Sequence, residues 1–254
     1  MGSMPKIIAE FLGLHDAMEF IDYYSAYFHY NFGRCGRKPG ICSISISDLS
    51  SVSKSEVCDI ANAIMDGSDA LLLPQETCIK HLVKSISVIC REAEPAIYQK
   101  QIFSELTRCV TTPTEALYSL AISAVESALK TNSAAIICLT SSGRTAKLLS
   151  RFRPRCPIIA VTRYARVARQ LRLYKGIEPL IYLKSFEGNW DKDVEERVQL
   201  GVTYGKYVGY IRMGDAVVSV TGSRPESGMP NNIQVVYASE FDALPRKNKY
   251  GNTL

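Results

Sequence analysis

A short run of hydroxyl side chains and one glycine lies between an apolar stretch and a helix-forming stretch. Thr140–Thr145 reads T-S-S-G-R-T and directly follows apolar residues that end at Leu139. The free N–H groups of a helix's first turn, together with the helix dipole, favour an anion at such a place. Hydroxyls there can donate hydrogen bonds to phosphate oxygens. The loop therefore predicts a phosphate-sized anion site, and an ordinary helix N-cap of Ser or Thr stays open as the alternative.

A second loop of similar chemistry lies further along the chain. Gly222–Gly228 reads G-S-R-P-E-S-G and follows the apolar run Ala216–Thr221. In an open α/β sheet, the loops at the carboxyl ends of neighbouring strands meet in one crevice. Two glycine- and hydroxyl-rich loops with Arg224 between them would suit a sugar phosphate. Trp190 and Arg197 are candidates to line this site and to cover the bound ligand.

The familiar signatures of other chemistries are missing from the sequence. It contains no G-x-G-x-x-G fingerprint, no Walker loop and no G-x-S-x-G elbow. The eight cysteines form no C-x-x-C pair, which favours small buried hydrophobes in a reducing compartment. The three histidines have no second ligand nearby in the sequence, so we expect no metal site.

Basic residues are concentrated in one window. Ten Lys and Arg residues and no Asp or Glu fall between Arg144 and Lys175, although the net charge of the chain is only +5. Such a patch attracts anions. It is either a solvated surface balanced by acids elsewhere in the fold or a surface for nucleic acid or an acidic partner. Sparse aromatic residues in the window disfavour nucleic acid.

Composition and patterning predict a globular α/β protein. With 254 residues, 46% hydrophobic and 22% charged, the chain can build one large domain or two smaller ones. It has no secretory signal and no apolar run long enough to cross a membrane, so we expect a cytoplasmic protein without membrane contact.

Strands and helices are predicted to alternate, which indicates a parallel α/β arrangement. Ser53 and Glu56 form a capping box for a helix that ends at Gly67. The first hundred residues predict strands 6–11, 40–46 and 69–73, helices 15–32 and 53–67, and one long helix from about Ile79 towards Phe103. The remainder predicts helices 112–130, 145–152, 166–174 and 191–207, strands 134–139, 158–162, 177–183, 216–221 and 233–238, and a loose tail over 241–254.

Five segments, in order along most of residues 5–240, carry a family resemblance. They are 59–73 (D-I-A-N-A-I-M-D-G-S-D-A-L-L-L), 142–146 (S-G-R-T-A), 153–163 (R-P-R-C-P-I-I-A-V-T-R), 193–198 (D-V-E-E-R-V) and 222–228. Together they resemble pyruvate kinase. The resemblance implies that residues 1–98 are a remnant of that family's catalytic (β/α)₈ barrel. It implies that residues 99–254 are its C-terminal regulatory α/β domain.

The positions that the resemblance assigns to catalysis are altered. Pyruvate kinases transfer the phosphoryl group of phosphoenolpyruvate to ADP with Mg²⁺ and K⁺, by positioning and charge neutralisation. Here Glu10 replaces the catalytic lysine, Leu12 a metal-binding glutamate and Ile44 the substrate threonine. The lid domain has no counterpart. We therefore expect neither catalysis nor a bound cofactor for this chain alone.

The resemblance transfers better to the site at which some family members bind a sugar bisphosphate activator. Ser141 replaces a lysine of that site, Ser223 a tryptophan and Glu226 a glycine, which should weaken phosphate binding. The predicted effector residues are Thr140, Ser142, Gly143, Thr145, Trp190, Arg197, Arg224, Ser227 and Gly228.

Two main hypotheses follow from the resemblance. The first is a non-catalytic pyruvate-kinase-like protein that binds a sugar bisphosphate, or that assembles with pyruvate kinase subunits as a homo- or hetero-oligomer. The second is an active pyruvate kinase represented by an incomplete or divergent chain. A nucleic-acid binder that uses the basic window is a third and weaker hypothesis.

Overall fold

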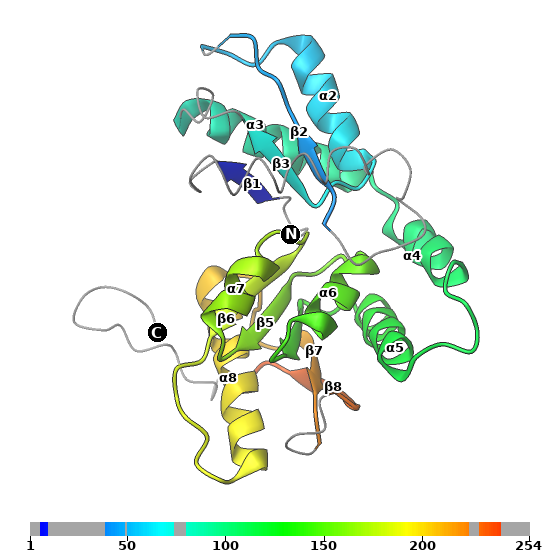
Figure 1. The fold of residues 1–254 in the computed structure, drawn as a ribbon, viewed down its shortest axis with the longest axis vertical. Coiled ribbons are helices and arrows are strands. Elements are labelled where there is room, and N and C mark those ends of the chain that lie inside the picture. The colour runs from blue at the N-terminus through cyan, green and yellow to red at the C-terminus, as the bar shows by residue number, and fades with distance from the viewer. Residues whose placement is uncertain (1–5, 10–38, 49, 74–79, 224–228, 240–254) are drawn as a thin grey trace, which may run out of the picture. The chain divides into compact units, whose positions relative to one another are not determined.

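The computed structural model describes residues 6–9, 39–48, 50–73, 80–223 and 229–239. These residues form two compact units (Figure 1). The N-terminal unit is built from Gly2–Gln101 together with Leu173–Lys175, and the C-terminal unit mainly from Ile102–Arg172 and Gly176–Leu254. Among the helices in these ranges, none is both long and apolar enough to cross a membrane.

The N-terminal unit contains a three-stranded parallel sheet. Strand β3 (Ala70–Leu73) lies between β1 (Lys6–Ala9) and β2 (Ile41–Ser43). Helices α2 (Lys54–Met65) and α3 (Lys80–Ala93) pack against each other beside it. Among the strands that the structure describes in this unit, the last in sequence is therefore the central one.

The capping box predicted for α2 is confirmed. The Ser53 hydroxyl accepts a hydrogen bond from the backbone N–H of Glu56 at 3.4 Å, and Glu56 accepts one from the backbone N–H of Ser53 at 2.7 Å. The helix ends at Met65, and Gly67 follows with a φ of +87°. Since glycine adopts this left-handed conformation without strain, the predicted stop signal is also confirmed.

The single long helix predicted from Ile79 towards Phe103 is wrong. Helix α3 ends at Ala93, a 3₁₀ turn covers Glu94–Ala96, and α4 (Gln99–Arg108) begins afterwards. Pro95 explains the break, because proline has no N–H for the helix and clashes with the preceding turn. Periodicity alone did not detect this interruption.

One further helix boundary differs from its prediction, and two predicted segments lie outside the residues that the structure describes. The helix predicted from residue 112 begins later, as α5 (Ala116–Lys130), because its N-cap Glu115 has an extended backbone conformation. The helix predicted over 15–32 and the tail over 241–254 lie outside the described residues.

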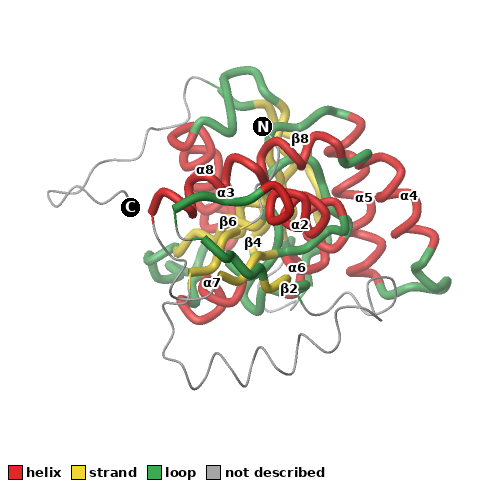
Figure 2. Tube along the Cα trace, turned by 90° about the horizontal axis from the view of Figure 1, so that it is seen from above, coloured by secondary structure: helices red, strands yellow, loops and turns green. Residues whose placement is uncertain are grey.

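The C-terminal unit is a five-stranded sheet covered by helices on both faces. The strand order is β6-β5-β4-β7-β8; the first four are parallel and β8 runs antiparallel to β7. Viewed from above, α8 lies on one side of these strands, and α5, α6 and α7 lie on the other (Figure 2). The strands are β4 (Ala135–Leu139), β5 (Ile158–Thr162), β6 (Ile177–Ile181), β7 (Ala216–Thr221) and β8 (Asn232–Tyr237), and the helices α6 (Arg144–Arg151), α7 (Ala165–Leu171) and α8 (Trp190–Val208).

The continuous apolar strands explain this double cover. Every residue of β4, β5 and β7 is buried, as expected for parallel strands packed on both faces. Helix α8 approaches the sheet closely through two glycines. A Cβ at Gly201 would lie 2.9 Å from the Ile137 side chain of β4, and one at Gly205 would lie 3.2 Å from the Ile159 side chain of β5 and 2.4 Å from that of Ile211, which follows the helix. The missing side chains therefore let α8 pack close to the sheet.

Candidate anion site

The parallel strands of the C-terminal unit all end at one edge of the sheet, which we call the carboxyl edge. In the paired register, Cys138 of β4 lies beside Val220 of β7, so the loops that follow these two strands start next to each other. This arrangement confirms that the sheet is parallel where the two predicted loops begin. Arg163 directly follows β5 at the same edge.

The first loop folds into the start of helix α6 with a glycine as its N-cap. Gly143 is the N-cap residue and has no side chain that could cap the helix. The buried Thr140 hydroxyl accepts a hydrogen bond from the backbone N–H of Gly143 at 2.9 Å, which shapes the loop. The exposed Ser142 hydroxyl lies 3.5 Å from the backbone N–H of Arg144, a long contact. The predicted Ser or Thr N-cap is therefore not what begins this helix.

Gly143 is required at this position for two reasons. Its φ of +80° lies in the left-handed region that favours glycine. A Cβ there would also lie 3.1 Å from Val167 Cγ1 and 3.2 Å from Leu171 Cδ2 of α7. The loop thus packs closely on α7 while the side chains of Ser141 and Ser142 remain exposed to solvent.

Trp190 connects the start of α8 to the carboxyl edge. Its indole Nε1 donates a hydrogen bond of 2.8 Å to the carbonyl oxygen of Gly222, the first residue after β7. The guanidinium carbon of Arg197 lies 5.3 Å from the centre of the Trp190 ring, within cation–π range. Phe186 contacts the same ring edge-on. Trp190 and Arg197 are therefore brought together at the edge where both predicted loops begin.

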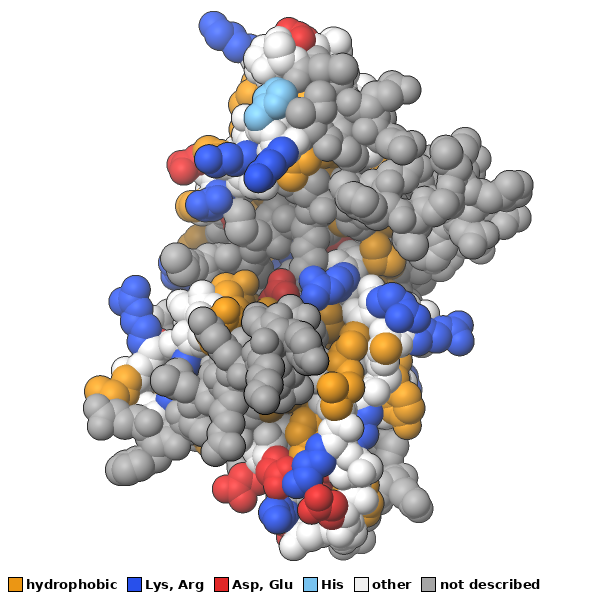
Figure 3. All heavy atoms as spheres, turned by 90° about the vertical axis from the view of Figure 1, so that its left-hand side faces the viewer, with side chains coloured by type: hydrophobic (Ala, Val, Ile, Leu, Met, Phe, Trp, Pro, Cys, Tyr) orange, Lys and Arg blue, Asp and Glu red, His pale blue; other side chains and the backbone are white. Residues whose placement is uncertain are grey.

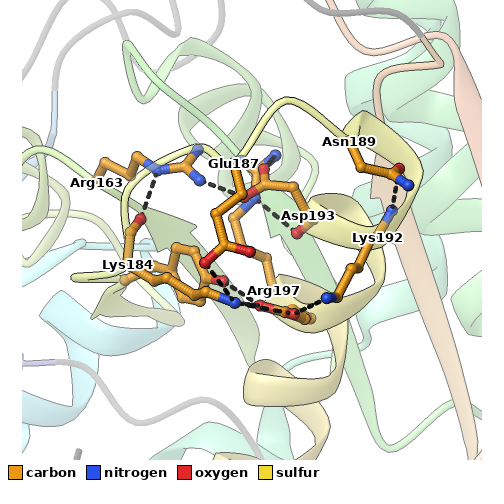
Figure 4. Close-up of polar contacts among 9 residues, drawn as sticks. Arg163, Lys184, Glu187, Asn189, Lys192, Asp193 and Arg197 are labelled. Atoms are coloured by element: carbon orange, nitrogen blue, oxygen red, sulfur yellow. Dashed lines mark hydrogen bonds and ion pairs between the residues drawn. The ribbon is translucent and has the colours of Figure 1, made fainter.

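Arg197 is held by a carboxylate from its own helix. Its Nη2 lies 2.6 Å from Asp193 Oδ2, and its Nε donates to the Asp193 backbone carbonyl at 3.2 Å. Arg163, from the end of β5, pairs with the other carboxylate oxygen of Asp193. Figure 4 shows both guanidinium groups directed at this one carboxylate. Burial lowers the pKa of Arg197, and the nearby Asp193 charge opposes that shift.

A second polar cluster braces the segment that leads into α8. The Tyr182 hydroxyl donates to Glu196 at 2.7 Å, and Lys184 Nζ lies 3.0 Å from the same carboxylate oxygen. Burial, together with the bond to Glu196, raises the pKa of Tyr182 to about 12, so this phenol keeps its proton. The hydrogen bond from Tyr182 lowers the pKa of Glu196, which therefore stays charged beside Lys184.

Sequence reasoning missed Arg163 and Asp193 as members of the site. Asp193 and Arg197 stand four residues apart on a helix, a spacing at which an acid and a base face each other. Arg163 follows its strand directly, as Thr140 follows β4. Both signals are present in the sequence, but only the fold places β5 and α8 side by side.

Several of the predicted residues cannot be placed. Arg224, Ser227 and Gly228, together with Glu226, lie outside the described residues. Ser223 is described: its backbone N–H donates to Asn231 Oδ1 at 2.8 Å, and its hydroxyl accepts from Asn231 Nδ2 at 2.7 Å. The second loop is therefore joined to the segment that precedes β8.

The resemblance assigns three positions to catalysis, and only one of them is described by the structure. Glu10 and Leu12 fall outside the described residues. Ile44 is 5% exposed and packs in the apolar core with Ile60, Leu71 and Leu73. In the part of the chain that the structure describes, no group of three or more His, Cys, Asp or Glu side chains is placed to hold a metal ion.

The basic window does not form a uniform positive surface. Arg144 Nη2 contacts both carboxylate oxygens of Glu115 at 2.6 and 2.8 Å, Arg163 pairs with Asp193, and Lys175 is buried beside Glu94. Figure 3 shows Asp and Glu side chains beside Lys and Arg side chains at the lower end of the face in view. The window is therefore partly neutralised by acids elsewhere in the fold, as the first of its two interpretations predicts.

Comparison with known proteins agrees with this architecture. Residues 118–236 match the family model described as "Pyruvate kinase, alpha/beta domain". The chain is 44% identical over 218 residues to pyruvate kinase PKLR of Homo sapiens, covering 82% of this chain and 38% of that protein. It is 36% identical over 209 residues to the pyruvate kinase of Candida albicans, covering 79% of this chain and 42% of that protein.

The match to the family model spans the C-terminal sheet from α5 to β8. The chain spans about two fifths of the length of the curated relatives it matches. Alignments that cover about four fifths of this chain, together with the α/β domain match, show that it belongs to the pyruvate kinase family.

Proposed function

We propose that this chain is a non-catalytic member of the pyruvate kinase family that binds a sugar bisphosphate at the carboxyl edge of its C-terminal sheet. The main support is the placement of Trp190. Its hydrogen bond to Gly222 brings the Trp190–Arg197 pair to the edge where the Thr140–Thr145 loop begins. A helix N-terminus, exposed hydroxyls and a guanidinium are groups that bind phosphate.

The loss of catalysis is supported by the chemistry of the altered positions. Ile44 contributes to an apolar core and offers no group that could contact a phosphate or carboxylate substrate. Glu10 and Leu12 carry the wrong charge and no metal-ligating oxygen, respectively, for the roles that the resemblance assigns. A phosphoryl-transfer site without these groups does not neutralise the charge of the transition state. The proposal therefore requires no Mg²⁺ or K⁺.

Binding is tested by titrating the protein with fructose 1,6-bisphosphate and following the fluorescence of Trp190, the only tryptophan in the chain. We expect a saturable change that is lost in Arg197→Met. Arg212→Met, which alters an exposed arginine in the segment that follows the C-terminal end of α8, is the control and should bind normally. If isothermal titration calorimetry detects no binding of fructose 1,6-bisphosphate by the wild-type protein, the proposal is contradicted.

Catalysis is tested separately with a lactate-dehydrogenase-coupled assay containing phosphoenolpyruvate, ADP, Mg²⁺ and K⁺. We expect no pyruvate above the rate without protein, while a full-length pyruvate kinase assayed in parallel is active. Turnover by this chain would instead favour a divergent active enzyme.

The proposal also includes association with pyruvate kinase subunits, because the C-terminal α/β domain is preserved beside altered catalytic positions. Co-expression of the tagged chain with a full-length subunit should give a co-purifying complex whose mass is measured by light scattering. Separate elution of the two proteins at micromolar concentration argues against this part of the proposal.

A further inference from the structure

Asp193 neutralises the arginine on which the proposed anion site depends. Its carboxylate is 6% exposed, and it contacts the 7% exposed Arg197 through one oxygen and Arg163 through the other. Two guanidinium groups on one carboxylate leave one positive charge in excess. The position therefore already resembles an occupied anion site, with a side chain in place of a ligand (Figure 4).

The contact between Asp193 and Arg197 is close but poorly directed. Arg197 Nη2 and Asp193 Oδ2 lie 2.6 Å apart, yet neither atom makes a hydrogen bond within the described part of the chain, and both are shielded from solvent. Guanidinium groups bind carboxylates and phosphates most strongly through paired, in-plane hydrogen bonds. A phosphate oxygen could therefore give Arg197 a directed bond that Asp193 does not provide.

Arg163 provides the means for Asp193 to give up Arg197. Its side chain is 27% exposed and is anchored by a hydrogen bond from its Nε to the Lys184 carbonyl at 3.2 Å and by the Tyr182 ring 5.2 Å away. Asp193 would remain paired with Arg163 if Arg197 turned towards a ligand. The exchange then leaves no buried carboxylate without a counter-ion, which would otherwise be costly.

We propose that Asp193 sets the affinity and charge selectivity of this site by competing with the ligand for Arg197. The inference rests on the proposed function. A carboxylate ligand offers Arg197 no more charge than Asp193 already does, whereas a phosphate carries nearly two charges. The site therefore accepts phosphate esters and rejects carboxylates of similar size. The same competition lowers the affinity of the site for phosphate.

The test compares Asp193→Asn with Asp191→Asn, because both changes remove one charge from the first turn of α8. Asp191 is exposed, whereas Asp193 is buried between the two arginines. Fluorescence of Trp190, which lies against Arg197, reports binding of fructose 1,6-bisphosphate, inorganic phosphate and acetate. We expect Asp193→Asn to bind the bisphosphate and inorganic phosphate about tenfold more tightly and to gain measurable acetate binding. Asp191→Asn should match the wild type.

The remaining outcomes decide against the inference in distinguishable ways. If Asp191→Asn tightens binding as much as Asp193→Asn, the effect is general electrostatics. If Asp193→Asn binds more weakly than the wild type while remaining folded by circular dichroism, Asp193 positions Arg197 rather than competing for it. In both cases the wild type still binds, so the proposed function stands.

If no variant binds any of the three anions, the inference and the proposed function both fail. Asp193→Ser, a second neutral variant, replaces Asp193→Asn if the latter is unfolded.

Discussion

At the scale of single residues, buried charges are where this protein is most sensitive to substitution. Glu94 and Lys175, both in the N-terminal unit, are 7% and 6% exposed and pair at 3.2 Å. Burial raises the pKa of Glu94, and the Lys175 charge opposes that shift. Glu56 is also buried but accepts hydrogen bonds from Ser47 and Ser53. These groups are stabilised only as long as their partners are present.

Lys175→Met should destabilise the N-terminal unit by about 3–5 kcal/mol, because it leaves the Glu94 carboxylate buried without its counter-ion. Urea denaturation followed by far-ultraviolet circular dichroism measures the loss. The double variant Lys175→Met/Glu94→Leu should recover most of it, since an apolar pair removes the stranded charge. A double variant as unstable as the single one would contradict this account.

Glu56 should make the stability of the N-terminal unit dependent on pH under acidic conditions. Hydrogen bonds from the Ser47 and Ser53 backbones lower its pKa from 4.5 to about 2. A carboxyl group whose pKa is lower in the folded protein than in the unfolded chain stabilises the fold when the pH is above the unfolded-chain pKa. That stabilisation is lost as the pH falls through the folded-state pKa. The stability difference between wild type and Glu56→Gln should therefore be constant above about pH 4.5 and disappear near pH 2. Thermal melts over this range measure it, and a difference that does not change with pH would be inconsistent with the capping role.

At the scale of elements, glycines decide how closely the site segments pack. Gly143 and Gly188 have nearly the same φ, +80° and +88°. A Cβ on Gly143 would press on Val167 and Leu171, whereas one on Gly188 would meet nothing within 4 Å. Alanine variants at these two glycines therefore distinguish the cost of left-handed backbone strain from the cost of steric crowding.

Gly188→Ala should cost about 1–2 kcal/mol from left-handed backbone strain alone. Gly143→Ala should cost about 1–3 kcal/mol more, because α7 must move to admit the new methyl group. Chemical unfolding followed by Trp190 fluorescence compares the two variants. Equal losses would show that α7 accommodates the methyl group freely.

The sequence was sufficient to predict the strands of the C-terminal sheet and the capping box of α2, because apolar periodicity and cap residues act locally. The long helix was mispredicted because periodicity continues on both sides of Pro95. The pairing of Arg163 with Asp193 joins residues 30 apart in sequence. No local pattern specifies that contact, since it depends on how α8 packs on the sheet.

At the scale of the whole molecule, the two units have separate apolar cores. Ile60, Leu71 and Ile86 belong to one, and Ile137 and Val217 to the other. Compact units with their own cores usually unfold as units. Trp190 lies in the C-terminal unit, so its fluorescence reports that unit alone.

Denaturant unfolding should therefore show two transitions by circular dichroism and one by Trp190 fluorescence. A saturating bisphosphate should move the fluorescence transition to higher denaturant, because a ligand that binds only the folded state stabilises it. The other transition should stay in place. Coincident curves from both probes at every denaturant concentration would show a single cooperative molecule.

The burial of Ile44 restricts which side chains this position tolerates. Its side chain packs with Ile60 and Leu73 in a core where a threonine hydroxyl would find mainly apolar neighbours. A threonine at position 44 would therefore lose stability, because its hydroxyl would be buried among apolar side chains. Sequences that share this packing should carry Ile, Val or Leu at position 44, because selection for stability alone disfavours a polar side chain there.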